Sequence, residues 1–378
     1  MKFRLERDVL ADAVTWVARA LPTRPPAPVL AGVRLTARPE SGGSLALSSF
    51  DYEVSARAEV QAAVEEPGEA LVPGKLLADI SRLLPDKPVD FTVEGSKAVV
   101  ACGASTFTLP RMPIEDYPTL PAMPQPAGVL NAGVFAEAVQ QAAVAATKDE
   151  TLPLLTGVRL EIEGEKMTLL ATDRYRLAIR EIRWTPGRPD ISGVALVRAK
   201  TLHDVARSFA HTEEISIALA ADSGADIIGF EAGGRHTTSL LIDGDYPSVR
   251  KLLPEASPIQ AVVSVPALME AVRRVSLVAE RNTPLQISFS EGQAVLNAGT
   301  GDDAQASEVI EATLEGDDIA VAFNPAYLIE GLGVMTAPLV RLSMSHPNKP
   351  VLFEGVASVE SQTSGEHLYL LVPIRFSG

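Results

Sequence analysis

The sequence predicts an α+β protein of three repeated domains, each with two helices on an antiparallel sheet. Three observations predict this fold class. One residue pattern recurs about every 125 residues, which is close to the usual size of a domain. The strands within that pattern alternate apolar and polar residues, as antiparallel strands with one solvated face do. Proline-rich stretches separate the copies, and 378 residues exceed what one compact core usually accommodates.

The first copy sets the order of the elements. They are a helix between Val9 and Leu21, an apolar segment at 28–35, a turn at Gly42 and Gly43, a second apolar segment at 45–51 and a second helix over 73–80. Apolar residues three and four apart predict the first helix. Pro73 favours a helix start at that point, because proline is common in the first turn of a helix.

The second and third copies keep this order. The second has a helix over 135–146, an apolar segment at 153–160, a turn at Gly164, a further segment at 169–173 and a second helix over 199–206. The third has a helix over 268–275, a segment at 284–287, a turn at Gly292, a further segment at 295–299 and a second helix over 324–331. In the second copy, Val158, Leu160 and Ile162 alternate with charged residues, which predicts a strand with one buried face.

Prolines mark the boundaries between the copies. Four prolines crowd the stretch 118–126, and Pro254 and Pro258 flank the second boundary. The pairs Tyr117-Pro118 and Tyr246-Pro247 close the first two copies alike. We therefore expect domains at 1–125, 126–256 and 257–378.

Composition limits the classes of function. A single cysteine, Cys102, cannot form an internal disulfide, and the chain begins with charged residues rather than an apolar signal run, so we expect a cytoplasmic protein. No stretch is long and apolar enough to span a bilayer, so we expect no membrane association. The net charge of −15 argues against nucleic-acid binding unless the cations are gathered on one face.

Motifs for catalysis, metals and cofactors are missing from the sequence. The five histidines have no zinc-binding spacing, and the segment 68–75 lacks both the glycine spacing and the hydroxyl of a phosphate-binding loop. Asp173 could be a general base, but its place between Arg174 and Arg176 favours a structural ion pair. We therefore expect no catalytic residue, no metal and no cofactor.

Two segments identify a family. Ala-Thr-Asp-Arg-Tyr-Arg-Leu-Ala at 171–178 and Tyr-Leu-Leu-Val-Pro-Ile-Arg-Phe at 369–376 closely resemble the bacterial DNA polymerase III beta subunit, the beta sliding clamp. Further signatures of that family occur in order at 24–30, 246–254 and 323–327, so the resemblance covers essentially the whole chain. The segment 49–57 and the terminal Ser377-Gly378 resemble clamps of high-GC Gram-positive bacteria.

The resemblance implies a head-to-tail homodimeric ring that encircles duplex DNA without regard to sequence and confers processivity on the replicative polymerase. Twelve helices about 9 Å apart would leave an opening on the order of 25 Å, which admits a duplex. Arg24 matches a position near the rim of the hole. The helices and their ends supply the other expected DNA-facing cations, namely Arg19, Lys75, Arg82, Lys148, Lys200, Arg207, Arg273 and Arg274. Any one of these could be an ordinary solvated charge, so only the set supports a lining.

The resemblance also implies a groove for partner peptides between the second and third domains. Its expected residues, the partner-groove set, are Leu155, Thr172, Arg174, Tyr175, Arg176, Leu177, Pro247, Lys251, Leu252, Asn324, Tyr327, Val372, Pro373, Ile374 and Arg375. The expected partners are the DNA polymerase III alpha subunit, the clamp loader and other replication or repair proteins. Leu155, Leu177 and Leu252 could instead belong to the core, and the C-terminal run could be an ordinary strand.

Ring closure would join the first domain of one chain to the third domain of its partner. Phe107, Leu109 and Leu277 match apolar positions of that interface, and Lys97 could pair there with Asp302 or Asp303. Two alternatives remain open. One is a paralogous clamp that confers resistance to a groove-binding antibiotic; the other is an enzyme on a clamp-like fold, which would need a polar cluster converging in one pocket.

Overall fold

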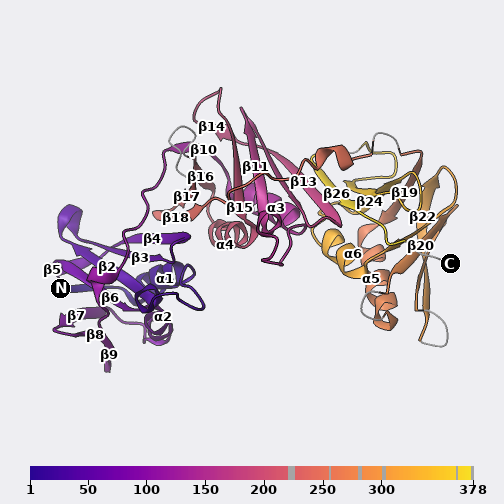
Figure 1. Ribbon diagram of the computed structural model, residues 1–378. Helices are drawn as coiled ribbons and strands as arrows, with labels where there is room; N and C mark the ends of the chain where they lie inside the picture. Colours follow the sequence, from indigo (N-terminus) through magenta and orange to yellow (C-terminus); the bar gives the residue numbers. More distant parts are fainter. Residues whose placement is uncertain (220–225, 255–256, 280–282, 300–303, 363–364, 376–378) are drawn as a thin grey trace. The chain divides into compact units, whose positions relative to one another are not determined.

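The computed structural model describes residues 1–219, 226–254, 257–279, 283–299, 304–362 and 365–375 (Figure 1). Helices and antiparallel strands alternate along the described chain in three rounds of one order. This confirms the predicted fold class and its threefold repetition. Expected residues Asp302 and Asp303 lie outside the described part.

Each repeat begins with a strand, a helix and three further strands, and the first repeat shows this order. Its elements are β1 (Lys2–Leu5), α1 (Arg7–Ala18), β2 (Gly32–Arg38), β3 (Ser44–Phe50), β4 (Val54–Gln61), β5 (Ala63–Glu66), β6 (Gly68–Pro73), α2 (Gly74–Leu83), β7 (Val89–Glu94), β8 (Lys97–Cys102) and β9 (Ser105–Pro110). Figure 1 shows α1 beside α2, and the two helices are in contact. The predicted second helix of this repeat is therefore confirmed.

The other two repeats follow the same plan. The second contains β10 (Pro126–Asn131), α3 (Ala132–Ala143), β11 (Gly157–Glu163), β12 (Lys166–Thr172), β13 (Arg176–Arg183), β14 (Thr185–Pro186), β15 (Ser192–Arg198), α4 (Ala199–Phe209), β16 (Glu214–Leu219), β17 (Ile227–Ala232) and β18 (Arg235–Leu240). The third contains β19 (Ile259–Ser264), α5 (Val265–Val275), β20 (Leu285–Ser290), β21 (Gln293–Ala298), β22 (Ala306–Glu315), β23 (Ile319–Phe323), α6 (Pro325–Leu332), β24 (Leu339–Met344), β25 (Val351–Val356) and β26 (His367–Leu371).

Local chemistry explains where the predicted elements begin and end. The apolar segments at 28–35 and 153–160 each open with a 3₁₀ turn, Pro28–Ala31 and Pro153–Thr156, before the strand starts at a glycine. Proline has the fixed φ that suits the first turn of a helix and lacks the N–H that a strand ladder uses, which favours the 3₁₀ turn at the start of these segments. Helix α1 ends before Leu21, which is nevertheless buried, so the periodic pattern continued past the helix itself.

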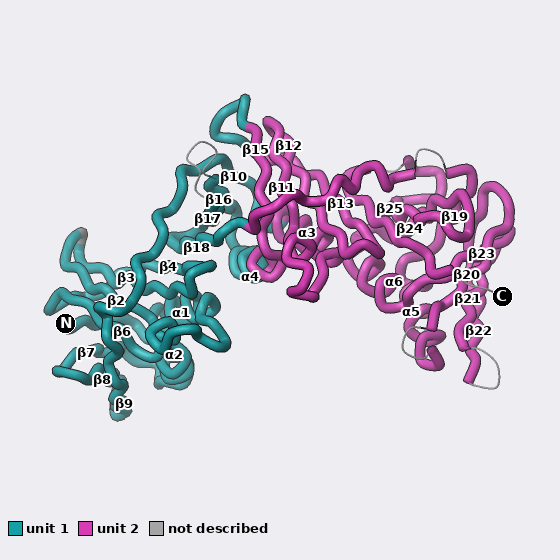
Figure 2. The backbone as a smooth tube through the Cα atoms, in the orientation of Figure 1, with its two compact units in different colours: residues 1–133, 185–191, 204–241 teal, residues 134–184, 192–203, 242–378 magenta. Residues whose placement is uncertain are grey.

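The strands form sheets of five, nine and twelve strands, and the sheets of nine and twelve strands each join strands of two repeats. Strand β4 pairs with β18, Val54 opposite Ser239, and β13 pairs with β26, Arg176 opposite Leu371. The chain forms two compact units (Figure 2), residues 1–133 with 185–191 and 204–241, and residues 134–184 with 192–203 and 242–378. Each cross-repeat pairing lies within one unit, and segments of the predicted second domain contribute to both units.

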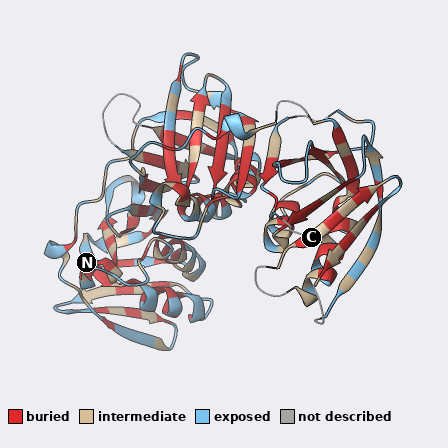
Figure 3. Ribbon diagram, turned by 45° about the vertical axis from the view of Figure 1, so that its right-hand side comes forward, coloured by how far each residue is buried: buried red, intermediate tan, exposed pale blue. Residues whose placement is uncertain are grey.

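Many strands present a buried and an outer face, and Figure 3 shows red segments beside paler ones, whereas β12 is buried along nearly its whole length. In β11, Val158, Leu160 and Ile162 are buried whereas Glu163 is exposed, which confirms the predicted alternation. Cys102 is buried and forms no disulfide. Among the described residues no helix is long and apolar enough to cross a membrane.

Candidate functional site

The turn between β12 and β13 is built around Asp173. Its Oδ1 accepts the backbone N–H groups of Tyr175 and Arg176, both at 3.0 Å, and Arg174 takes a left-handed conformation with φ 80°. The Oδ2 atom accepts from Nε of Arg176 at 2.9 Å. Both partners of this ion pair are buried, so Asp173 is a structural carboxylate, as predicted.

Arg176 connects this turn to helix α6. Its Nη1 lies 2.5 Å from Oε2 of Glu330, and its guanidinium stacks over the ring of Tyr327 at 4.3 Å. Burial by itself lowers the pKa of Arg176. The neighbouring Tyr369, Glu330 and Asp173 raise this pKa by more than burial lowers it, so the net pKa lies above its ordinary value. The guanidinium therefore stays charged and fixes the Tyr327 ring from one side.

Two tyrosines form an aromatic wall beside this network. The rings of Tyr175 and Tyr327 stack with centroids 6.3 Å apart, and Tyr175 is 54% exposed. The hydroxyl of Tyr369 donates to the carbonyl of Tyr327 at 2.8 Å. Gly331 permits this approach, because a Cβ there would lie 2.3 Å from the Tyr369 ring. Asn324 caps α6 by accepting the N–H of Ala326 at 2.9 Å.

An apolar cluster lies below the β12–β13 turn. Its buried members are Leu155, Leu170, Leu177, Ile179, Leu196, Tyr246, Val249 and Leu370. The Oη of Tyr246 accepts the N–H of Thr172 at 3.0 Å, which ties the Tyr246-Pro247 segment to the end of β12. Of the three leucines with a core alternative, Leu155 and Leu177 are buried in this cluster, whereas Leu252 is 47% exposed. Leu155 and Leu177 can form the floor of a groove at this turn, and Leu252 can contact a ligand directly.

The C-terminal run lies against the same turn. The N–H of Val372 donates to the carbonyl of Tyr175, and that of Ile374 donates to the carbonyl of Ala322, both at 2.8 Å. Pro373 is buried, whereas Arg375 is exposed. Lys251 is also exposed and lies in the 3₁₀ turn Arg250–Leu252, next to cluster member Val249. The structure thus gathers most of the partner-groove set around one turn.

The nine expected DNA-facing cations are all exposed. Arg19, Lys75 and Arg82 line one shallow cleft of about 330 Å³ between α1 and α2. Burial lowers the pKa of Arg19, and the charges of Arg207 and Arg235 lower it further, so Arg207 lies near this group. The expected residues of the other helices and loops are Arg24, Lys148, Lys200, Arg273 and Arg274.

Three of these cations are paired with carboxylates, and one of them, Arg82, pairs with Asp79 on the same helix. Arg274 lies 2.6 Å from Glu308, and Arg273 lies 3.2 Å from Glu270. Sequence periodicity placed both arginines on α5 but gave no sign of Glu308, which comes from β22. Arg82, Arg273 and Arg274 therefore offer less positive charge to a duplex than Arg19 and Lys75 do.

The expected interface residues lie on strand edges and an exposed turn. Phe107, 39% exposed, and Leu109, fully buried, belong to β9, the end strand of the five-stranded sheet. Leu277 is 85% exposed in the 3₁₀ turn Ser276–Val278. Lys97 is exposed at the start of β8. Leu109 thus belongs to the core of its own sheet, and Phe107 and Leu277 are free for contact.

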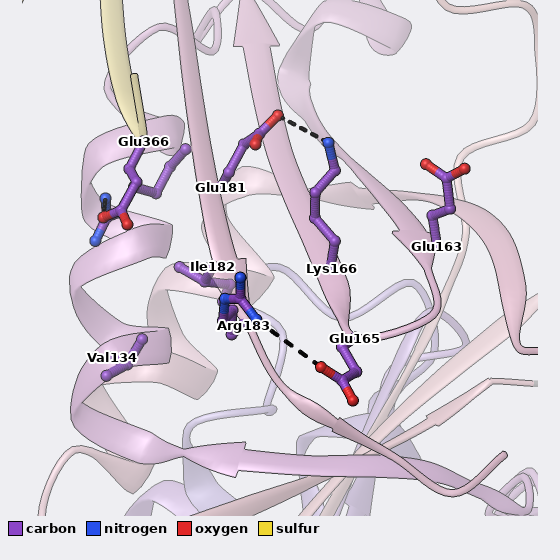
Figure 4. Close-up of a pocket in the computed structure, with 9 residues that line it drawn as sticks. Val134, Glu163, Glu165, Lys166, Glu181, Ile182, Arg183 and Glu366 are labelled. Atoms are coloured by element: carbon purple, nitrogen blue, oxygen red, sulfur yellow. Dashed lines mark hydrogen bonds and ion pairs between the residues drawn. The ribbon is translucent and has the colours of Figure 1, made fainter. Parts of the chain in front are cut away.

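A hollow of about 640 Å³ was not predicted from the sequence (Figure 4). Six of its seven charged side chains form ion pairs with one another: Lys166 with Glu181 at 3.2 Å, Arg183 with Glu165 at 3.9 Å and Arg180 with Glu366 at 3.1 Å. None of these six is left without a partner of opposite charge. Nor do three metal-binding side chains of the described residues gather anywhere.

Comparison with protein families matches the chain in three successive parts. The N-terminal domain of the DNA polymerase III beta subunit matches residues 1–121, its central domain matches 129–248, and its C-terminal domain matches 250–365. These matches together cover nearly the whole sequence.

Individual relatives agree with that match. The beta sliding clamp of Streptomyces coelicolor is 52% identical over 379 residues, covering 100% of both chains. The beta sliding clamp homolog GriR of Streptomyces muensis is 44% identical over 377 residues, again covering 100% of each. Among solved structures, a sliding clamp of Pseudomonas aeruginosa bound to griselimycin is 26% identical, covers 100% of both chains and superposes with a TM-score of 0.90.

Proposed function

Because this chain belongs to the DNA polymerase III beta subunit family of sliding clamps, we propose that it closes around duplex DNA as a head-to-tail homodimeric ring. The ring tethers the replicative polymerase to its template and supplies processivity, with no catalytic step of its own. It works in the cytoplasm, where bacterial DNA is replicated. Its hold on DNA is topological rather than sequence-specific.

The pairing of strands across repeats is the observation that carries the proposal. In each of the first two repeats, the third strand after the first helix pairs with the last strand of the next repeat, β4 with β18 and β13 with β26. Strand β22 holds the same position in the third repeat, and β9 is the last strand of the first. Residues 306–311 of β22 pair only with β21 among the described strands. A second copy that placed its β9 on this edge would continue the rule and close the ring.

The distribution of charge suits a sliding contact. A net charge of −15 keeps most of the surface from binding DNA, while the α1–α2 cleft gathers Arg19, Lys75 and Arg82, of which Arg82 pairs with Asp79. Because phosphate contacts release counterions, many such cations would bind DNA tightly and hold the ring in place. A sparse set attracts the duplex and still allows movement along it.

Partner proteins are expected to bind at the partner-groove set. The aromatic wall of Tyr175 and Tyr327 and the exposed Leu252 offer apolar contacts, and Arg174 and Lys251 offer positive charge beside them. This combination fits an extended peptide with one or two apolar anchors and acidic flanks. We infer that the polymerase alpha subunit and the clamp loader carry such segments.

One relative favours the housekeeping role over that of a resistance paralogue. The chain is 52% identical to the Streptomyces coelicolor clamp and 44% identical to the homolog GriR, both over their full lengths. Greater similarity to the clamp than to the GriR homolog supports routine replication as the main role.

Retention on circular DNA tests the ring. Labelled protein is loaded onto a nicked circular plasmid with a clamp loader, and the complex is isolated by gel filtration. Encirclement predicts that cutting the plasmid once releases most of the protein, whereas an uncut plasmid retains it. Release at equal rates from both forms, or retention on the linear form, would contradict the proposal.

A further inference from the structure

The 3₁₀ turn Arg250–Leu252 carries two exposed members of the partner-groove set, Lys251 and Leu252. Val249, just before the turn, is buried in the apolar cluster below the β12–β13 turn, and Leu253, just after it, packs against the same cluster. A turn of three residues makes few hydrogen bonds of its own, so its position depends on what the residues in and around it contact. The contacts of its first residue therefore matter for where Lys251 and Leu252 lie.

Arg250 ties this turn to strand β11. Its Nη2 donates to Oε2 of Glu161 at 2.7 Å, and Oε1 of the same carboxylate accepts from Nε of Arg159 at 2.8 Å. Burial by itself raises the pKa of Glu161, but the hydrogen bonds and charges of Arg250 and Arg159 lower this pKa by more, so the carboxylate is ionised at neutral pH. Charge-assisted hydrogen bonds of this kind are about twice as strong as neutral ones. One partly buried acid thus holds two guanidinium groups.

The first repeat places its corresponding acid differently. In β2, the counterpart of β11, Thr36 stands where β11 has Glu161, and it lies opposite Glu69 on β6. Glu69 pairs with Arg34 of β2 at 2.9 Å, so that ion pair joins two neighbouring strands of one sheet. Glu161 lies instead opposite the exposed Val194 on β15. The acid has thus changed strand in the second repeat, which contains β12, β13 and the turn between them, and from β11 it reaches the Arg250 side chain.

We propose that Glu161 is a positioning residue of the partner groove, which acts through Arg250 to fix the turn that presents Leu252 and Lys251 to a peptide. This inference rests on the proposed function in taking the partner-groove set as a peptide site. A turn that is held in place before binding loses less conformational freedom when the peptide binds, so the affinity is higher. Because Glu161 neutralises Arg250, the positive charge that the turn offers to an acidic flank comes from Lys251.

Amide hydrogen exchange tests the tie itself, without any peptide. Mass spectrometry of the full-length protein follows the segment 249–253, whose turn is closed by two backbone hydrogen bonds of 2.9 and 3.2 Å. Glu161→Gln keeps the shape of the side chain and removes its charge, so exchange in this segment is expected to become about fivefold faster. Glu69→Gln is the matched control, because it breaks the ion pair of the first repeat. It should leave exchange at 249–253 unchanged.

Peptide affinity tests the consequence for binding. The probe is a fluorescein-labelled hexapeptide with a central Leu-Phe pair and two serines on each side, measured by fluorescence anisotropy. Its flanks are neutral because Glu161→Gln also uncovers positive charge, which would by itself attract an acidic flank. We expect affinity to fall about fivefold in Glu161→Gln and in Arg250→Gln, and no further in the double variant, because the two residues act as one pair. Arg250→Lys keeps the charge and should bind within about twofold of the wild type.

The two measurements separate the positioning role from the groove itself. Unchanged exchange in Glu161→Gln would overturn the positioning role, and so would full peptide affinity despite faster exchange. Losses that add up in the double variant would contradict an action through Arg250. Ile374→Ala, which alters another member of the partner-groove set, should weaken the same peptide. If the wild type does not bind the peptide, the partner-groove assignment fails, whereas faster exchange in Glu161→Gln still supports the tie between Glu161 and the turn.

Discussion

At the residue scale, Glu330 has a role that its own helix does not explain. A carboxylate in the last turn of α6 faces the negative end of the helix dipole, which disfavours it. Its compensation is the contact at 2.5 Å with Arg176, whose guanidinium stacks on Tyr327. Glu330 thus positions the aromatic wall of the partner-groove set.

Replacing Glu330 by glutamine tests this role. The substitution keeps the shape and removes the charge, so Arg176 and Tyr327 should lose their fixed arrangement. We expect a fluorescein-labelled hexapeptide, with a central Leu-Phe pair flanked by two glutamates on each side, to bind three- to tenfold more weakly, roughly 1 kcal/mol for one charge-assisted hydrogen bond. Fluorescence anisotropy measures the change.

Glu308→Gln is the matched control for that measurement. Its carboxylate also pairs with an arginine, Arg274, at 2.6 Å, but that pair lies on α5 and β22. The control should leave peptide affinity unaltered. An equal effect of both substitutions would show a general response to lost charge and would remove the specific role of Glu330.

At the element scale, the pairing of β26 with β13 should depend on pH through His367. The residue lies opposite Arg180, and burial, together with the charge of Arg180, lowers its pKa from 6.5 to about 4. In the unfolded chain His367 therefore becomes protonated below about pH 6.5, whereas in the folded chain it becomes protonated only near pH 4. The associated stability is complete above pH 6.5 and is lost as the pH falls to about 4, by up to about 3 kcal/mol.

Urea unfolding between pH 4 and 7.5 measures this loss. The variant His367→Gln removes the titration, so its unfolding free energy should fall less steeply than that of the wild type in this window. The two proteins have the same carboxylates, so the contribution of those groups cancels in the comparison. Parallel curves for the two proteins would mean that His367 is protonated equally in both states.

Local sequence patterns predicted the helices and turns better than they predicted which strands pair with one another. The first helices follow from apolar spacing, and the turns at Gly42, Gly43, Gly164 and Gly292 all have the positive φ for which glycine is suited. The cross-repeat pairs β4–β18 and β13–β26 could not be predicted, since any strand edge offers the same hydrogen-bonding groups and the paired residues are far apart in sequence.

The residues of the candidate site were likewise predicted better than the contacts between them. The sequence predicted which residues gather at the β12–β13 turn because their order resembles that of a family. It did not reveal that Glu330 contacts Arg176, that Glu308 neutralises Arg274 or that Tyr52 repeats the conformation of Arg174. These features depend on how side chains from different elements are directed and on backbone conformation, and neither can be derived from residue spacing alone.

At the scale of the whole molecule, ring closure should depend on exposed apolar residues that the folded chain leaves uncovered. Phe107 on β9, Leu277 in the turn after α5 and Val309 on β22 are 39%, 85% and 58% exposed. All three lie on or beside the elements that the pairing rule joins in a second copy. Burying such side chains contributes about 1 to 2 kcal/mol each, so the dimer should be sensitive to a charge placed among them.

The variant Phe107→Glu is therefore expected to raise the dimer dissociation constant by about a hundredfold, roughly 3 kcal/mol, because it replaces apolar burial by an unpaired carboxylate. Sedimentation equilibrium measures the constant directly. Leu83→Glu is the matched control, since Leu83 is 86% exposed on α2 and lies on neither joined strand. A dimer weakened equally by both variants, or by neither, would exclude the β9–β22 junction. Monomers released by Phe107→Glu should also lose retention on circular plasmid, because an open chain encloses nothing.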